Sequence, residues 1–220
     1  MPGRKRFSFL EELKNNGWTV LDDVVESAAF LQLAHSIGAP SIGIHRYRIE
    51  HLSPTTANAA KAGTMSSQYG LGEFPLHTDT AHWPTPARYI LLRSVGLSHS
   101  RSTIIASTKD LPFNPEQRHL IAQGTWLVSQ VAQPFTCSVF FQPNEYAFRF
   151  DAACMRPYNS AAKRIHQHII DTLKQSNYKE IKWSPGRVLI VDNWRMLHGR
   201  ADSRETNEVR TLQRITIPWV

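Results

Sequence analysis

Short strand-like segments fill most of the sequence, and they constrain the fold more than any other feature. They are rich in Val, Ile, Thr, Phe and Tyr, and Pro, Gly, Asn and Ser separate them. We expect strands at 44–51, 87–95, 102–108, 125–131, 135–142, 146–151, 187–192 and 209–218. Because these strands outnumber the helices and do not alternate with them, a doubly wound sheet is disfavoured. The pattern predicts a mainly β fold with flanking helices, a double-stranded β-helix (jelly roll) of the cupin-like kind.

The remaining segments predict a few helices and one long loop. Helical patterns cover 8–16 and 26–37, and a third helix begins after Asn159. Residues 53–75 are rich in small and polar side chains, which predicts a loop that is either a lid over a site or a plain surface loop. The chain has 220 residues and shows no repeat or linker, so we expect a single domain over residues 1–220.

The charge and cysteine content narrow the classes of partner and compartment. The formal net charge is +7, yet apart from Arg4–Arg6 the basic residues are scattered, which favours small anionic ligands in a pocket over a nucleic-acid face. No run approaches the roughly 18 apolar residues of a membrane span, and the basic start lacks the apolar core of a secretory signal. Cys137 and Cys154 have no spacing that demands a disulfide, so we expect two free thiols in the cytoplasm. Oligomeric state is not indicated.

Two separated motifs carry candidate metal ligands. In His77-Thr78-Asp79, an extended backbone points the histidine and the aspartate to the same face. His198 follows the apolar run 188–191, and Gly199 lets the backbone pass close to a ligand. Two histidines and one carboxylate on one side of an ion leave other positions open, as non-haem iron(II) requires for oxygen chemistry.

Two arginines downstream of His198 suggest that an anion binds beside this site. Arg210 lies twelve residues beyond His198, and Arg214 follows four residues later on the same face of a predicted strand. A core-facing arginine needs an anionic partner, and its planar fork fits a carboxylate. The pair therefore predicts a dicarboxylate ligand or an anionic substrate.

Together these motifs carry a family resemblance. The run Phe74–Asp79 with Trp83-Pro84, and the run Asp192–Arg200 with the two downstream arginines, resemble the motifs of the TauD/TfdA-like oxygenases over roughly residues 70–220. The resemblance implies that His77, Asp79 and His198 bind Fe(II) as the catalytic centre. It also implies that Arg210 and Thr103 bind the cosubstrate 2-oxoglutarate, with Arg214 near its other carboxylate or an acidic group of the substrate.

The activity that the resemblance implies is hydroxylation of a small polar or anionic metabolite with O2, releasing succinate and CO2. Because Asp79 is present, hydroxylation, or a desaturating or ring-forming variant, is preferred to halogenation. The chain departs from the family at 98–102, Ser-His-Ser-Arg-Ser, where glycines are usual. It is also shorter than most members, so we expect fewer insertions over the site.

The substrate-facing residues are less defined. His82, Trp83 and Arg149 are candidate substrate contacts, although the first two can equally pack locally. Arg149 and Asp151 share a strand face. They can contact an anionic or polar substrate or form an ion pair with each other, and the ion pair is the favoured interpretation. Asn193 is expected to hold the His198 loop. Two alternative functions stay open: an oxygenase that acts on protein or nucleic acid, and a jelly-roll metal-binding protein without oxygen chemistry.

Overall fold

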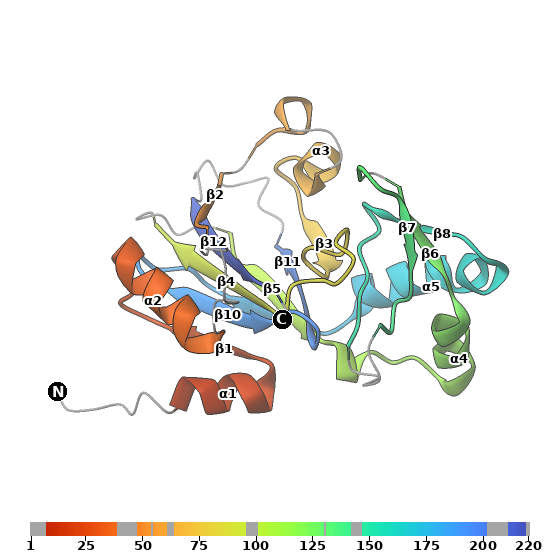
Figure 1. Cartoon of the computed structure of the whole chain (residues 1–220), viewed down its shortest axis with the longest axis horizontal. Helices are drawn as coiled ribbons and strands as arrows, with labels where there is room; N and C mark the ends of the chain where they lie inside the picture. The colour runs from red at the N-terminus through yellow and green to blue at the C-terminus, as the bar shows by residue number, and fades with distance from the viewer. Residues whose placement is uncertain are drawn as a thin grey trace.

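The computed structural model describes residues 8–38, 48–53, 55–60, 64–95, 101–129, 131–141, 147–201 and 211–218. Two antiparallel sheets form its centre (Figure 1). The first has the strand order β1 (Trp18–Leu21), β10 (Val188–Asp192), β4 (Tyr89–Ser94), β12 (Leu212–Ile217) and β2 (Glu50–Leu52). The second has the order β3 (Phe74–His77), β11 (Met196–Arg200), β5 (Thr103–Ser107) and β9 (Lys179–Ile181). This arrangement confirms the predicted mainly β fold.

Helices and a small third sheet cover the outer faces (Figure 1). On one side lie α1 (Ser8–Asn16) and α2 (Ser27–Ile37). On the other side lie η2 (Thr108–Asp110), α4 (Pro115–Gln123), α5 (Ser160–Gln175) and the sheet β7 (Phe135–Cys137), β6 (Trp126–Val128) and β8 (Met155–Pro157). The segment with η1 (Ala57–Ala59) and α3 (Met65–Tyr69) lies above the β3 and β11 strands. The described part of the chain has no helix that is long and apolar enough to span a bilayer.

Alternating side chains on the central strands explain the layers. On β10, Leu189 and Val191 enter the core between the two sheets, whereas Val188 and Ile190 pack beneath α1 and α2. A strand that is buried on both faces has a continuous apolar sequence. The strand at 187–192 was predictable because its sequence has this property.

Several expectations need correction. The predicted loop 53–75 is wrong where it covers η1, α3 and the start of β3. The strand predicted at 146–151 forms only the isolated bridge Phe140↔Phe148. The strand predicted at 44–51 is described only from residue 48, where β2 begins at Glu50. Both cysteines are free, as expected.

Gly199 has a different role from the one predicted. A Cβ at this position would lie 2.5 Å from the backbone oxygen of Phe74 and 3.1 Å from that of Pro75. The glycine thus allows β11 to approach the neighbouring strand β3, rather than a ligand.

We expect Gly199→Ala to lower the free energy of unfolding by about 2–3 kcal/mol, because the added methyl group overpacks the β3–β11 junction. Gly72→Ala is the control, since its Cβ would meet one atom, the Tyr69 oxygen at 3.2 Å. Urea denaturation measures both variants, and equal stability of Gly199→Ala and the native chain would contradict the account.

Candidate metal centre and its cavity

Strand pairing brings the two histidines together. His77 ends β3 and stands directly opposite His198 of β11 in the antiparallel register. Their ring centroids are 4.7 Å apart. The Nδ1 atom of His77 lies 2.9 Å from the Pro75 oxygen. Since a carbonyl can only accept, that contact places the proton on Nδ1 and leaves Nε2 as the metal-binding atom.

Asp79 follows the end of β3, and its carboxylate is held by two donors. Arg214 Nη1 donates to Oδ2 at 2.7 Å, and the Thr80 N–H donates to Oδ1 at 2.9 Å. Burial would raise the pKa of Asp79, but Arg214, the two histidines and the Thr80 N–H lower it to about 2. The carboxylate is therefore ionised at neutral pH and available to a cation.

The backbone around Asp79 is fixed by two polar side chains. Asn193 is fully buried. Its Oδ1 atom accepts a hydrogen bond from the Asp79 N–H at 2.9 Å. Its Nδ2 atom donates to the backbone oxygen of Asp79 at 3.0 Å and to that of Ala87 at 2.9 Å. Asn193 lies in the turn between β10 and β11, so these bonds tie the turn that leads to His198 to the Asp79 backbone. On the other side, Thr78 exchanges three hydrogen bonds with Phe148 and Phe150.

We expect Asn193→Asp to lower the free energy of unfolding by about 2–3 kcal/mol and to weaken divalent-metal binding by about tenfold. The variant removes two donors, which leaves the buried oxygens of Asp79 and Ala87 unsatisfied. Asn114→Asp is the matched control at the exposed N-cap of α4. Urea denaturation and Mn(II) titration measure both, and equal metal affinity of the two variants would contradict this role for Asn193.

His77, Asp79 and His198 provide ligand types that suit iron, although their side chains are not placed around one common point. Within the described ranges, no three His, Cys, Asp or Glu side chains are placed to hold a metal ion together. A carboxylate has about four lone-pair sites, so Asp79 can keep its two hydrogen bonds and still bind an ion. Two imidazoles and one ionised carboxylate fit Fe(II) with open coordination positions.

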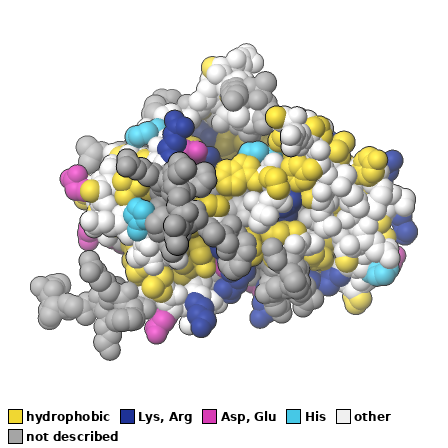
Figure 2. All heavy atoms as spheres, in the orientation of Figure 1, with side chains coloured by type: hydrophobic (Ala, Val, Ile, Leu, Met, Phe, Trp, Pro, Cys, Tyr) yellow, Lys and Arg dark blue, Asp and Glu magenta, His cyan; other side chains and the backbone are white. Residues whose placement is uncertain are grey.

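A cavity of about 950 Å³ opens over these residues, and His77, Asp79 and His198 line it. Figure 2 shows this face hollowed beneath the segment that carries α3, with basic and histidine side chains at the rim of the hollow. Thr103, Arg214 and His82 also line the cavity, as does Asp151, one of the possible substrate contacts. Two further lining residues, Arg101 and Arg200, were not predicted as ligand contacts.

Two predicted site residues that the structure describes, Trp83 and Arg149, do not line the cavity. Trp83 is 36% exposed. Arg149 is buried, donates to the Pro84 oxygen at 2.7 Å and lies over the Phe141 ring, so the expected ion pair with Asp151 is wrong. Arg210 lies outside the described residues.

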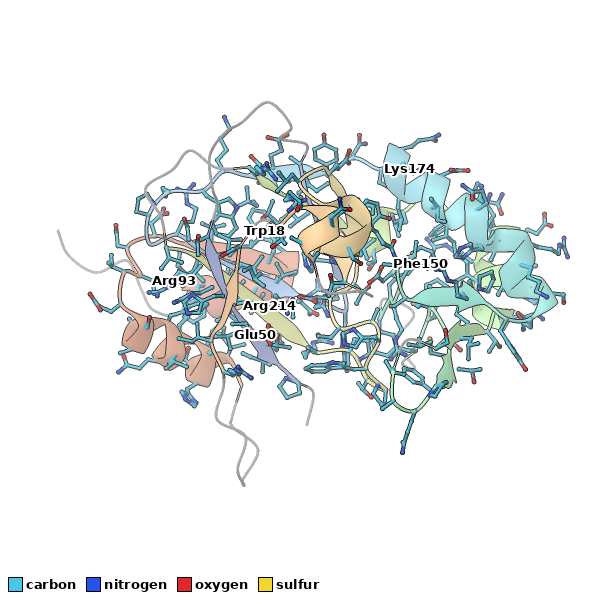
Figure 3. The ribbon with its side chains drawn as sticks, turned by 90° about the horizontal axis from the view of Figure 1, so that it is seen from above. Trp18, Glu50, Arg93, Phe150, Lys174 and Arg214 are labelled. Carbon is cyan, nitrogen blue, oxygen red and sulfur yellow. The ribbon has the colours of Figure 1, made fainter. Side chains whose placement is uncertain are left out.

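Arg214 already has carboxylate partners. Its Nε and Nη2 atoms donate to Glu50 Oε2 at 2.8 and 2.6 Å, and its Nη1 atom donates to Asp79. Figure 3 shows Arg214 beside Glu50, with β12 and β2 as neighbouring strands. Glu50 was not predicted; its only signal is its place in a predicted strand whose partner was unknown.

Comparisons with known proteins agree with this fold. The family model described as taurine catabolism dioxygenase TauD, TfdA family, matches residues 125–216, which include His198. The non-heme iron oxygenase OrfP, solved with Fe and alpha-ketoglutaric acid, has a TM-score of 0.69 at 16% identity over 96% of this chain and 78% of that chain. PvcB from Pseudomonas aeruginosa has a TM-score of 0.68 at 15% identity over 94% and 78%.

OrfP has also been solved with Fe, succinate and (3S)-hydroxy-L-Arg, and with Fe and L-canavanine. No curated protein matches the sequence. The family match over the C-terminal part and the fold shared with these oxygenases agree with the motif resemblance to the TauD/TfdA family.

Proposed function

We propose that this chain is an Fe(II)- and 2-oxoglutarate-dependent oxygenase that hydroxylates a small polar or anionic metabolite, or desaturates or cyclises it. The observation that carries the proposal is the register pair His77–His198, with the ionised Asp79 beside it, in one cavity. The proposal covers residues 1–220 as one catalytic domain. Two free thiols favour a cytoplasmic location.

His77, Asp79 and His198 line one cavity and would hold the iron. By the family resemblance, Arg210 would bind the far carboxylate of 2-oxoglutarate. When bound, the metal and the 2-oxo acid supply the oxidising chemistry with O2, while the protein supplies position and electrostatics. Arg214 keeps Asp79 ionised, and Asn193 fixes its backbone. A cavity of about 950 Å³ suits a small molecule.

Succinate release tests the proposal and the substrate class together. We expect protein supplied with Fe(II), 2-oxoglutarate and O2 to release succinate faster when one of a panel of amino acids, small acids and peptide-derived metabolites is added. Amino acids come first in the panel because OrfP has been solved with arginine derivatives. Iron-free protein is the control, and succinate release that does not depend on Fe(II) would refute the proposal.

A further inference from the structure

Thr80 follows the proposed metal ligand Asp79 and has an unusual backbone conformation. Its φ angle is 56°, in the left-handed region. Among the residues that the structure describes, Asp23 is the only other non-glycine residue with a positive φ. Aspartate tolerates this region, whereas a β-branched threonine is an outlier in it. Such strain persists only where the surrounding structure enforces it, and it is concentrated at functional sites. Thr80 is also buried and lines the cavity.

The hydroxyl group of Thr80 holds this conformation. Its Oγ1 atom donates a hydrogen bond to the backbone oxygen of Asp79 at 2.6 Å and accepts one from the Ala87 N–H at 2.8 Å. Ala87 is fully buried, so it anchors the hydroxyl to a fixed part of the backbone. Asn193 Nδ2 is a second donor to the same Asp79 oxygen. These bonds hold the Asp79 oxygen on one side of the chain.

The peptide group between Asp79 and Thr80 carries both this oxygen and an N–H that reaches the carboxylate. The Thr80 N–H donates to Asp79 Oδ1 at 2.9 Å. Turning the peptide over would return φ of Thr80 to a negative value with little change in the path of the chain, as when a type II turn becomes a type I turn. It would also point the N–H away from the carboxylate and break both bonds to the Asp79 backbone oxygen. The strained peptide and the orientation of the carboxylate are therefore linked.

We infer that Thr80 is a positioning residue, whose hydroxyl keeps the 79–80 peptide in the orientation that sets the Asp79 carboxylate for metal binding. The inference rests on the proposed metal centre, and it concerns the chain before any ligand binds. The Thr80 N–H fixes Oδ1, and Arg214 fixes Oδ2. A carboxylate that is oriented in advance loses less conformational freedom when it binds an ion.

The inference predicts an order of metal affinity that a packing role would reverse. Valine has nearly the shape of threonine, but it lacks the hydroxyl and resists a positive φ, so we expect the peptide to turn over in Thr80→Val. Glycine also lacks the hydroxyl, but it adopts a positive φ readily. We expect Thr80→Val to weaken Mn(II) binding about tenfold and Thr80→Gly to weaken it by less than about threefold. If Thr80 only filled space, valine would be the milder change.

The experiment titrates Mn(II) into metal-free native protein and each variant, and follows the free ion by its EPR signal. Urea denaturation checks that each variant is folded. Thr80→Ser keeps the hydroxyl and should retain native affinity. Thr19→Val is the matched control, because Thr19 is buried, donates to Glu12 at 2.6 Å and does not line the cavity. Native affinity in Thr80→Val, or weaker binding by Thr80→Gly than by Thr80→Val, overturns the inference.

A further variant keeps the test decisive if Thr80→Val does not fold. Thr80→Ala also lacks the hydroxyl and also carries a Cβ that resists a positive φ. It should bind Mn(II) more weakly than Thr80→Gly, and the reverse order overturns the inference. A native chain without saturable Mn(II) binding overturns both the metal centre and this role of Thr80. If the variants bind Mn(II) in the expected order but native protein with Fe(II), 2-oxoglutarate and O2 releases no succinate, the oxygenase activity is refuted and the positioning role stands.

Discussion

Replacing Asp79 by alanine is expected to abolish Fe(II) retention and to lower substrate-dependent succinate release by about a thousandfold or more. Two losses combine in this variant. The proposed centre loses its only anionic ligand. Arg214 Nη1 loses its 2.7 Å contact with Asp79 Oδ2, and its positive charge stays beside the ion site. A thousandfold fall in turnover corresponds to about 4 kcal/mol of lost transition-state stabilisation, and we attribute it to the lost metal ligand, while Arg214 keeps its pair with Glu50.

The measurement for Asp79→Ala is iron content after anaerobic desalting, followed by succinate release at saturating 2-oxoglutarate. Asp110→Ala removes an exposed carboxylate at η2 that does not line the cavity, and it serves as the control. Asp79→Glu keeps the charge but moves it, so we expect partial retention of iron. If Asp79→Ala retains iron and turnover at native levels, Asp79 is not a ligand.

Replacing Arg210 by alanine is expected to raise the 2-oxoglutarate concentration for half-maximal turnover by about a hundredfold. The family resemblance assigns this arginine to the far carboxylate of the cosubstrate, and loss of a charge-assisted contact costs up to about 3 kcal/mol. The assay varies 2-oxoglutarate at saturating Fe(II), with Arg187→Ala as the control. An unchanged requirement would remove Arg210 from this role.

Strands β4, β5, β6, β7, β10 and β12 all lie inside predicted segments, and burial on both faces explains three of them. These three are β4, β5 and β10, whose apolar side chains enter the core. By contrast, β3 and β11 contain Pro, His, Gly and Arg and become strands through pairing with each other and with β5. Such long-range pairing leaves little mark on local composition.

One missed helix did carry a local signal. The α4 helix begins after Asn114, which forms a capping box with Gln117, and Pro115 occupies the first turn. The pattern Asn-Pro-x-Gln is a recognisable helix start. This capping pattern is sufficient to predict a helix that begins at Pro115.

The candidate site was predictable where its residues occur in sequence motifs. The order of His77, Asp79 and His198 pointed to one metal centre, and the structure brings the two histidine rings to a centroid distance of 4.7 Å. The partners of the charged residues were not predictable, because Glu50 reaches Arg214 from a strand 164 positions away in sequence. Likewise, Arg200 looked like an ordinary motif residue until strand pairing placed it beside Thr103.

The central claim is tested most directly by adding 2-oxoglutarate to anaerobic Fe(II) protein and recording the visible spectrum. The account predicts a weak charge-transfer band in the native chain, and loss of both the band and the bound iron in His77→Ala. His35→Ala, on the helix α2, is the histidine control and should keep both. A native chain without the band, together with a His77→Ala variant whose metal content is unchanged, would contradict the account.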